Sequence, residues 1–243
     1  MTKVVEDSMF CIKSGYTENL VQTTYDPSDE TEYWSEARIA TASLYQYDVY
    51  ALAAKLVRQR GSGSVMDVGS GPPRKLATLV DDGKVDVHIV DQPNTAALAR
   101  RILPRASFHA VNLEVADLRI GRQFDVIICA DVIEHLVDPR ACLEFIRAHL
   151  APHGALVLST PERDVLRGQA CIRSMHPQHV REWNQAEFCE FISGSGFRVV
   201  NLGLMPQMRA SMLRRLWGRT RQLLGRPPSW YSCQYLVCEA RSE

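Results

Sequence analysis

The chain has 243 residues, enough for one large domain with additions or for two small domains. Its 46% apolar and 23% charged residues are ordinary for a soluble globular protein and allow a substantial core. The formal net charge is zero, which excludes a global field that would attract nucleic acid or a membrane surface.

The first elements in chain order are a polar stretch and a helical segment. Residues 1–30 are irregular, with "TTYDPSDE" as a loop. From about Glu32 to Arg60, apolar residues recur at helical spacing until Gly61 and Gly63 end the pattern.

Short apolar runs then alternate with helical segments. Strands are predicted at 64–69, 85–91, 106–113, 124–131, 154–160 and 197–204, and helices at 74–82, 94–103, 138–150 and 184–194. Asp138 before Pro139, and Asn184 before Glu187, are typical helix starts. The alternation predicts an α/β fold with a doubly wound, mostly parallel sheet covered on both faces. A last strand within 229–240 would close the sheet edge antiparallel.

A nucleotide site is indicated where the first two strands end. The stretch "VMDVGSGPPRK" places Asp67, Gly69 and Gly71 at a strand-to-helix turn, where glycines let a ligand approach the backbone. About 20 residues later, "HIVDQP" ends the second strand at Asp91, where such folds have the carboxylate that binds ribose hydroxyls. Each feature alone is also found in ordinary turns and solvated strand ends. A nicotinamide site is the weaker alternative, because Arg74 stands where its last glycine would be.

These motifs, with "FDVIICADVIEHLVDP" at 124–139, resemble the successive motifs of class I S-adenosylmethionine-dependent methyltransferases over residues 60–204. The resemblance implies a seven-stranded, Rossmann-like sheet. It also implies that S-adenosylmethionine is bound by a set of residues at the strand ends. They are Asp67, Gly69 and Gly71 at the methionine part, Asp91 at the ribose, Asn112 and Leu113 beside the adenine, and Asp131 near the methyl donor. Pro72 and Pro73 depart from the family pattern and stiffen the turn.

Two acids and an imidazole follow the fourth strand within one turn, at Asp131, Glu134 and His135. Ligands of open α/β sheets bind at this edge, so a cation shared by these side chains would explain why they are close together. The alternative is that Glu134 and His135 cap or orient the next helix. A second histidine-rich stretch, "HPQHVREWN" at 176–184, would add a further ligand from the same rim.

This pairing resembles the metal-dependent small-RNA 3′-terminal 2′-O-methyltransferases. The resemblance implies Mg²⁺ or Mn²⁺ held by Asp131, Glu134, His135 and His179, with "REW" at 181–183 as the accompanying signature. Oxygen-rich, mixed ligation suits these ions better than zinc. His176 is the best remaining general base and Glu182 a weaker one, with His135 also expected at the reacting centre. As an alternative, His176 and Glu182 are surface residues of a loop.

The acceptor is expected to be a hydroxyl, because a cation lowers the high pKa of an alcohol. Residues 205–226 contain six arginines and no acid, with apolar residues along one helical face. This basic helical insertion is read as a helix docked over the sheet end, a lid, a membrane-surface helix or a contact to an anionic polymer. The compact, arginine-rich chain resembles methyltransferases of actinobacterial polysaccharide clusters, including the 1-O-methyltransferase of methylmannose polysaccharide synthesis.

We therefore expect O-methylation of a sugar or oligosaccharide hydroxyl. An aromatic or quinone-precursor hydroxyl is second, an RNA 2′-hydroxyl third, and a non-catalytic cofactor-binding scaffold is the alternative from another class. No RNA-binding module is evident, so nucleic acid is not an expected partner.

The sequence also predicts the domain boundaries and the cellular location. Residues 1–60 would form an extension and lid, and 61–243 the cofactor-binding domain, with insertions at 161–183 and 205–228. Seven scattered cysteines without a C-x-x-C pair favour reduced thiols in a cytoplasmic protein. No apolar stretch is long enough for a transmembrane span or a signal peptide. A homodimer is a further expectation.

Overall fold

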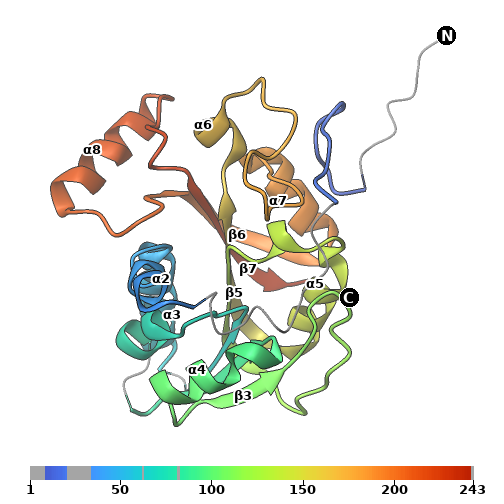
Figure 1. Cartoon of the computed structure of the whole chain (residues 1–243), viewed down its shortest axis with the longest axis vertical. Coiled ribbons are helices and arrows are strands. Elements are labelled where there is room, and N and C mark those ends of the chain that lie inside the picture. The colour runs from blue at the N-terminus through green and yellow to red at the C-terminus, as the bar shows by residue number, and fades with distance from the viewer. Residues whose placement is uncertain (1–8, 21–33, 62, 81–82, 242–243) are drawn as a thin grey trace.

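A single sheet forms the centre of the computed structural model, which describes residues 9–20, 34–61, 63–80 and 83–241 (Figure 1). The sheet has seven strands in the order β3-β2-β1-β4-β5-β7-β6. The strands are β1 (Ser64–Val68), β2 (Asp86–Asp91), β3 (Ser107–Ala110), β4 (Phe124–Ala130), β5 (Leu150–Pro161), β6 (Phe197–Met205) and β7 (Cys233–Ala240). The predicted doubly wound, mostly parallel seven-stranded sheet is confirmed.

The last strand differs in position from the expectation. β7 pairs antiparallel with both β5 and β6, so β6 and not β7 is the edge strand. The burial of the two strands agrees with this order. β7 is buried from Cys233 to Cys238 apart from Tyr235, whereas Val200 and Leu202 of β6 are exposed.

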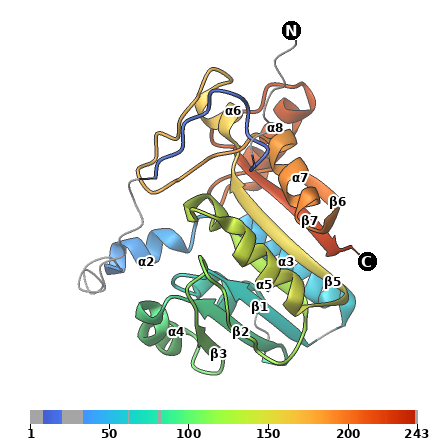
Figure 2. The same ribbon diagram turned by 90° about the vertical axis from the view of Figure 1, so that its right-hand side faces the viewer.

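Helices cover both faces of the sheet because successive strand residues point to opposite sides. Val65 packs with the face covered by α3 (Tyr47–Arg60), η2 (Leu76–Val80) and α4 (Ala96–Ile102). Met66, the next residue, packs with the face covered by α5 (Pro139–His149) and α7 (Gln185–Gly194). Figure 2 shows the sheet between these two layers.

The predicted helix starts are confirmed at α5 and α7. The Asp138 side chain accepts a hydrogen bond from the backbone N–H of Arg140, with Pro139 in the first turn. Asn184 and Glu187 form a reciprocal capping box. Such caps satisfy amide groups that have no partner inside the helix.

The helices predicted at 32–60 and 74–82 differ in detail from those of the structure. The helical pattern at 32–60 forms α2 (Glu36–Ala42) and α3, because Gln46 adopts a left-handed conformation with φ of 49°. In the described part of the segment predicted at 74–82, residues 74–75 are α-helical and lead into the short π-helix η2, and a 3-10 turn, η3 (Pro93–Thr95), precedes α4. Residues 21–33, including the start of the predicted first helix, lie outside the described residues.

Three further segments lie at the carboxyl end of the sheet. They are η4 (Ile133–His135) after β4, α6 (Arg163–Arg167) after β5, and α8 (Met212–Leu223) between β6 and β7. The basic segment becomes helical only at Met212, because Gln207 and Arg209 pair through their backbones with Gln46 and Leu44. None of the helices in the described parts of the chain is long and apolar enough to cross a bilayer.

All seven cysteines lie in described positions, and no disulfide joins any two of them. The division into a 1–60 lid and a 61–243 domain stays a prediction.

Candidate functional site

The turn after β1 requires glycine at Gly69. Both Gly69 and Gly71 have positive φ, 71° and 54°, a region that side chains other than glycine rarely adopt. A Cβ at Gly69 would lie 2.5 Å from Cγ2 of Val132, and a Cβ at Gly71 would lie 3.3 Å from Cη2 of Trp34. The glycine turn therefore lies close to Val132, which follows β4, and to Trp34, which precedes α2.

Asp91 binds this glycine turn directly. Its Oδ2 accepts a hydrogen bond of 2.7 Å from the backbone N–H of Gly71, and its Oδ1 accepts one of 2.7 Å from Gln92. Burial raises the pKa of Asp91 to about 6, although both backbone donors favour the charged form. The carboxylate thus joins the ends of β1 and β2, where the sequence predicts a ribose contact.

Asp67 lies at the floor of the same region, fully buried. Its Oδ2 accepts a 2.9 Å hydrogen bond from the Tyr50 hydroxyl, while Oδ1 has no hydrogen-bond partner in the described residues. Burial raises the pKa of Asp67 to about 7. An unpaired buried oxygen is a candidate for a ligand contact.

Lys75 supplies the positive charge near Asp67. Its Nζ donates to the carbonyl of Ala42 at 2.8 Å and to Oε1 of Gln46 at 3.4 Å, and it lies 4.8 Å from the centre of the Tyr50 ring. Burial lowers the pKa of this ammonium, whereas Asp67 and Asp131 raise it. Sequence reasoning missed Lys75, although it is the last residue of the stretch "VMDVGSGPPRK", and it missed Tyr50 and Gln46, which no local motif marks.

Asn112 and Leu113 follow β3. Asn112 is exposed and its Oδ1 accepts a hydrogen bond from the Glu114 N–H at 3.0 Å, while Leu113 is buried in the core. The backbone N–H of Val111 bonds to the carbonyl of Asp91, so this segment runs beside the predicted ribose residue. Their place at the adenine stays a prediction.

Asp131 directly follows β4 in a left-handed conformation, with φ of 54°. Its Oδ1 accepts from the Ser159 hydroxyl at 2.7 Å, and its Oδ2 accepts from Nε2 of Gln46 at 2.6 Å. The carboxylate therefore connects β4, β5 and the turn before α3. It lies outside the compact group of ligand atoms described next, so the structure does not bring together all four predicted metal ligands.

Three of the four predicted ligands are close together. Glu134, His135 and His179 each offer an atom within 4.8 Å of the other two. Glu134 is fully buried, and neither of its oxygens makes a well-formed hydrogen bond in the described chain, although its own backbone N–H and the Thr160 hydroxyl lie near enough to favour its charged form. Burial, and secondarily the nearby Asp131, raises the pKa of Glu134 well above its usual range. A buried carboxyl without a partner is costly unless something else, such as a cation, satisfies it.

The two imidazoles are oriented through their Nδ1 atoms. Nδ1 of His135 lies 2.8 Å from the carbonyl oxygen of Gln178, and Nδ1 of His179 lies 2.7 Å from Oε1 of Glu182. An N–H donated at Nδ1 leaves Nε2 with a lone pair for a metal. Burial and the neighbouring His179 lower the pKa of His135 to about 4, which keeps its ring neutral.

Comparison with known proteins decides the family. Residues 23–202 match the family model described as a methyltransferase domain. The chain belongs to this methyltransferase family.

Relatives of this methyltransferase domain agree with the assignment. A ubiquinone biosynthesis O-methyltransferase from Haemophilus ducreyi is 27% identical over 135 residues, 50% of this chain and 57% of that protein. A probable S-adenosylmethionine-dependent methyltransferase from Mycolicibacterium smegmatis is 27% identical over 145 residues, 60% of this chain and 56% of that protein. The matched regions thus span little more than half of these curated relatives.

Solved methyltransferases share the fold. The putative methyltransferase in complex with the Haloferax volcanii Trm112 activator has a TM-score of 0.66 at 16% identity, with 90% of this chain and 99% of that chain covered. The 1,6-didemethyltoxoflavin-N1-methyltransferase of Burkholderia thailandensis, solved with bound 1,6-didemethyltoxoflavin and S-adenosylhomocysteine, has a TM-score of 0.59 at 21% identity, covering 89% of this chain and 87% of that one. At such identities the likeness supports the fold alone.

Glu182 is fully buried and positioned to orient His179. Besides His179, its carboxylate accepts hydrogen bonds from Nη2 and Nε of Arg167 at 3.1 and 3.3 Å. Burial alone would raise the pKa of Glu182, but the hydrogen bonds from His179 and Arg167 outweigh it and lower the pKa to about 2. Its predicted role as a general base is untested, and this geometry supports a positioning role.

His176 stacks on His179, with ring centroids 4.0 Å apart and planes at 27°. Its Nδ1 accepts a hydrogen bond from the Gln178 N–H at 3.2 Å, and burial lowers its pKa. The ring therefore lies beside the three-residue group without joining it. Its role as a general base stays a prediction.

The N-terminal strap, residues 9–20, holds the histidine loop, residues 171–184, in place (Figure 2). Nδ2 of Asn19 donates to the carbonyls of Ser174 and His179, both at 3.1 Å. The Tyr16 hydroxyl accepts from the Glu182 N–H at 2.9 Å, and the Trp183 indole donates to the carbonyl of Phe10 at 2.8 Å. Sequence reasoning missed these contacts because no motif marks the strap.

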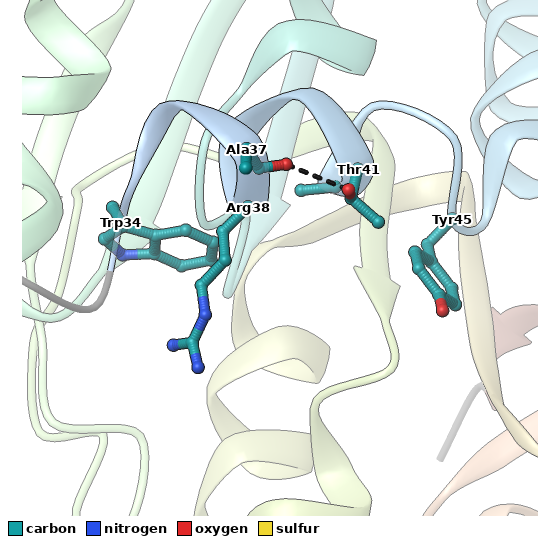
Figure 3. Close-up of a pocket in the computed structure, with 6 residues that line it drawn as sticks. Trp34, Ala37, Arg38, Thr41 and Tyr45 are labelled. Atoms are coloured by element: carbon teal, nitrogen blue, oxygen red, sulfur yellow. Dashed lines mark hydrogen bonds between the residues drawn. The ribbon is translucent and has the colours of Figure 1, made fainter.

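A shallow cavity of about 340 Å³ lies along α2. Figure 3 shows Trp34, Arg38 and Tyr45 on the same side of the helix and its following turn. Trp34 also approaches Gly71, so the cavity borders the glycine turn of the methyltransferase domain.

Proposed function

We propose that this methyltransferase domain transfers a methyl group from S-adenosylmethionine to a saccharide hydroxyl, with a divalent cation at Glu134, His135 and His179. The single observation that supports the metal-assisted reaction is the convergence of these three side chains, with an unpaired, fully buried carboxyl among them. Glu134 and His135 follow the carboxyl end of β4, beside the glycine turn. This position supports a reacting centre shared by the cation and the cofactor.

The residues at the ends of β1 and β2 fit S-adenosylmethionine. Bound there, the cofactor supplies an electrophilic methyl group. The glycine turn allows close backbone approach, Asp67 offers an unpaired oxygen, and Asp91 offers a carboxylate fixed by two backbone donors. Asp131, fixed by Gln46 and Ser159, would border the methyl donor.

Replacing Asp91 by alanine is expected to weaken S-adenosylmethionine binding about 10–150-fold. Charge-assisted hydrogen bonds to a ribose contribute about 1.5–3 kcal/mol, and the substitution also releases the Gly71 N–H. Isothermal titration calorimetry measures the change. Asp117→Ala, at an exposed carboxylate, is the matched control, and equal affinity of both variants would remove Asp91 from the cofactor site.

The three converging side chains fit a divalent cation. A bound cation lowers the pKa of an alcohol and fixes its position. Glu134 would supply the charge, and the two Nδ1 hydrogen bonds would leave the Nε2 lone pairs of His135 and His179 available to the cation. Two nitrogens and one oxygen favour Mn²⁺ over Mg²⁺, because imidazole is a softer ligand than carboxylate. Without Asp131 the ligand set is no longer the oxygen-rich one that weighed against zinc.

The acceptor is proposed to be a sugar, because neighbouring hydroxyls offer paired oxygen donors to such a site. An aromatic or quinone-precursor hydroxyl is the second candidate, which the names of the ubiquinone-biosynthesis relatives favour. A zero net charge weighs against RNA. A homodimer stays a prediction.

The deciding experiment measures methyl transfer from labelled S-adenosylmethionine to saccharides, catechol-type phenols and RNA 3′ ends, with and without EDTA. EDTA-sensitive labelling of saccharides is expected. Labelling of phenols alone would select the second candidate, and EDTA-resistant labelling would remove the cation from the proposal.

His179 and His176 are expected to differ in a metal titration. His179→Ala should raise the Mn²⁺ concentration for half-maximal rate about 10–100-fold, as expected for a lost ligand. His176→Ala should instead lower the rate at saturating Mn²⁺ about 10²–10⁴-fold if it is the general base. A wild-type titration curve for His179→Ala would show that the histidine loop does not hold the cation.

A further inference from the structure

Helix α8 has an apolar face turned toward solvent. Six of its apolar positions, counting its C-cap, are more than half exposed. They are Met212, Leu213, Leu216, Trp217, Leu223 and Leu224. Monomeric globular proteins usually bury such a run against their own core.

The geometry of an α-helix gathers these side chains on one side. At 100° per residue they fall within an arc of about 140°. Gly218 lies opposite the arc and is buried, where an added Cβ would be 2.5 Å from Cδ2 of Tyr231. The body of the protein therefore meets the glycine side of the helix. The apolar arc points outward, except that Trp217 at its edge stacks on Trp230, with ring centroids 5.9 Å apart. Figure 1 shows α8 projecting from one end of the molecule.

Arginines border the arc on both sides. On the helical wheel Arg214 and Arg221 lie along one edge, and Arg215 and Arg219 along the other. Arg214 and Arg219 are exposed, and Arg215 pairs with Asp48 of α3 at 2.6 Å. The segment 205–226 contains no acid. An apolar face between two basic rows is complementary to an anionic surface with an apolar interior.

A second copy of the chain fits this face less well. In a symmetric dimer each patch meets its own copy, so basic rows would meet basic rows without an acid in the segment. A helix of 12 residues is about 18 Å long, too short to span the hydrocarbon core of a bilayer. It has the size and charge of a helix that lies in the plane of the membrane surface.

We propose that α8 docks this methyltransferase domain onto an anionic phospholipid bilayer. The apolar arc enters the boundary of the acyl chains, and the flanking arginines bind the lipid phosphates. The interaction does not depend on the identity of the methyl acceptor, so it goes beyond the proposed function.

The helix is fixed to the rim of the site. The Gln46 N–H bonds to the carbonyl of Gln207 at 3.0 Å, and the Arg209 N–H to that of Leu44 at 2.8 Å. Gln46 in turn binds Asp131. Docking through α8 would therefore hold the turn between α2 and α3 close to the membrane.

Flotation of the full chain with vesicles tests the proposal. Wild-type protein should float with vesicles of phosphatidylglycerol and phosphatidylcholine at low salt, and less at high salt or with phosphatidylcholine alone. Leu213→Glu with Leu223→Glu should lower partitioning at least about tenfold, because two leucines no longer enter the apolar layer. Arg214→Gln with Arg219→Gln should lower it about fivefold per arginine, for anionic vesicles only.

The matched control adds two acids at exposed apolar residues elsewhere, Val115→Glu with Ile172→Glu. It changes the net charge equally and should float like wild type. Circular dichroism and light scattering on every variant report folding and oligomeric state. Absence of wild-type flotation, or equal loss in the control, would overturn the proposal. A dimer that only Leu213→Glu with Leu223→Glu dissociates, without vesicle binding, would assign the face to a second copy instead.

Discussion

Replacing Glu134 by glutamine is expected to abolish Mn²⁺ binding and to lower the rate of methyl transfer on the order of 10³-fold. The substitution keeps the shape of the side chain but removes the only carboxylate of the three converging residues. A bound cation typically contributes several kcal/mol to the stabilisation of developing charge, and about 1.4 kcal/mol corresponds to a factor of ten in rate. Calorimetric titration with Mn²⁺ and the rate at saturating cofactor measure the two effects.

Glu144→Gln is the matched control, at an exposed carboxylate of α5. Cofactor affinity should stay unchanged in both variants, since Asp67 and Asp91 are intact. Unchanged rate in Glu134→Gln, together with full activity of EDTA-treated wild type, would leave Glu134 and His135 with a structural role at the start of the next helix. The family assignment would stand.

Replacing Arg163 by alanine is expected to lower the free energy of unfolding by about 3–5 kcal/mol, as for a broken buried ion pair. Arg163 is fully buried and binds both oxygens of Glu187, at 2.6 and 2.9 Å. It also donates to the carbonyl of Glu182 at 3.2 Å. Its loss would leave Glu187 largely buried without its main cationic partner. Urea denaturation followed by circular dichroism measures the change.

Arg198→Ala is the matched control, because Arg198 pairs with Glu239 in an exposed position. An exposed pair contributes about 0–1 kcal/mol. Equal unfolding midpoints for the two variants would show that the Arg163 pair does not stabilise the fold.

Much of the fold could be predicted because its determinants are local. The alternation of apolar runs and helical segments located all seven strands, and the caps at Asp138 and Asn184 located two helix starts to within a residue. The break at Gln46 could not be predicted. Its left-handed backbone follows from tertiary pairing with Gln207 and from contacts to Lys75 and Asp131, none of which is encoded in the neighbouring residues.

The residues of the site likewise include some that local motifs predict and others that only long-range contacts reveal. Gly69, Asp91, Glu134 and His135 belong to short motifs whose spacing already places them at strand ends. His179 could be linked to them only through resemblance to a family, and its position now rests on the fold. Asp131 matches the motif, yet Gln46 and Ser159 occupy both of its oxygens with hydrogen bonds, an arrangement that only long-range contacts reveal.

The N-terminal strap has a consequence for how the chain folds. Its long-range hydrogen bonds join residues 154 to 174 positions apart, as in Asn19 to Arg173 and Lys13 to Glu187. At a synthesis rate of about 5–20 residues per second, the strap is made roughly 10–30 s before the histidine loop to which it binds. Loop closure over such distances is entropically costly and slow. The histidine loop should therefore become ordered after the parallel sheet, so that competence to bind the cation is acquired in a late step of folding.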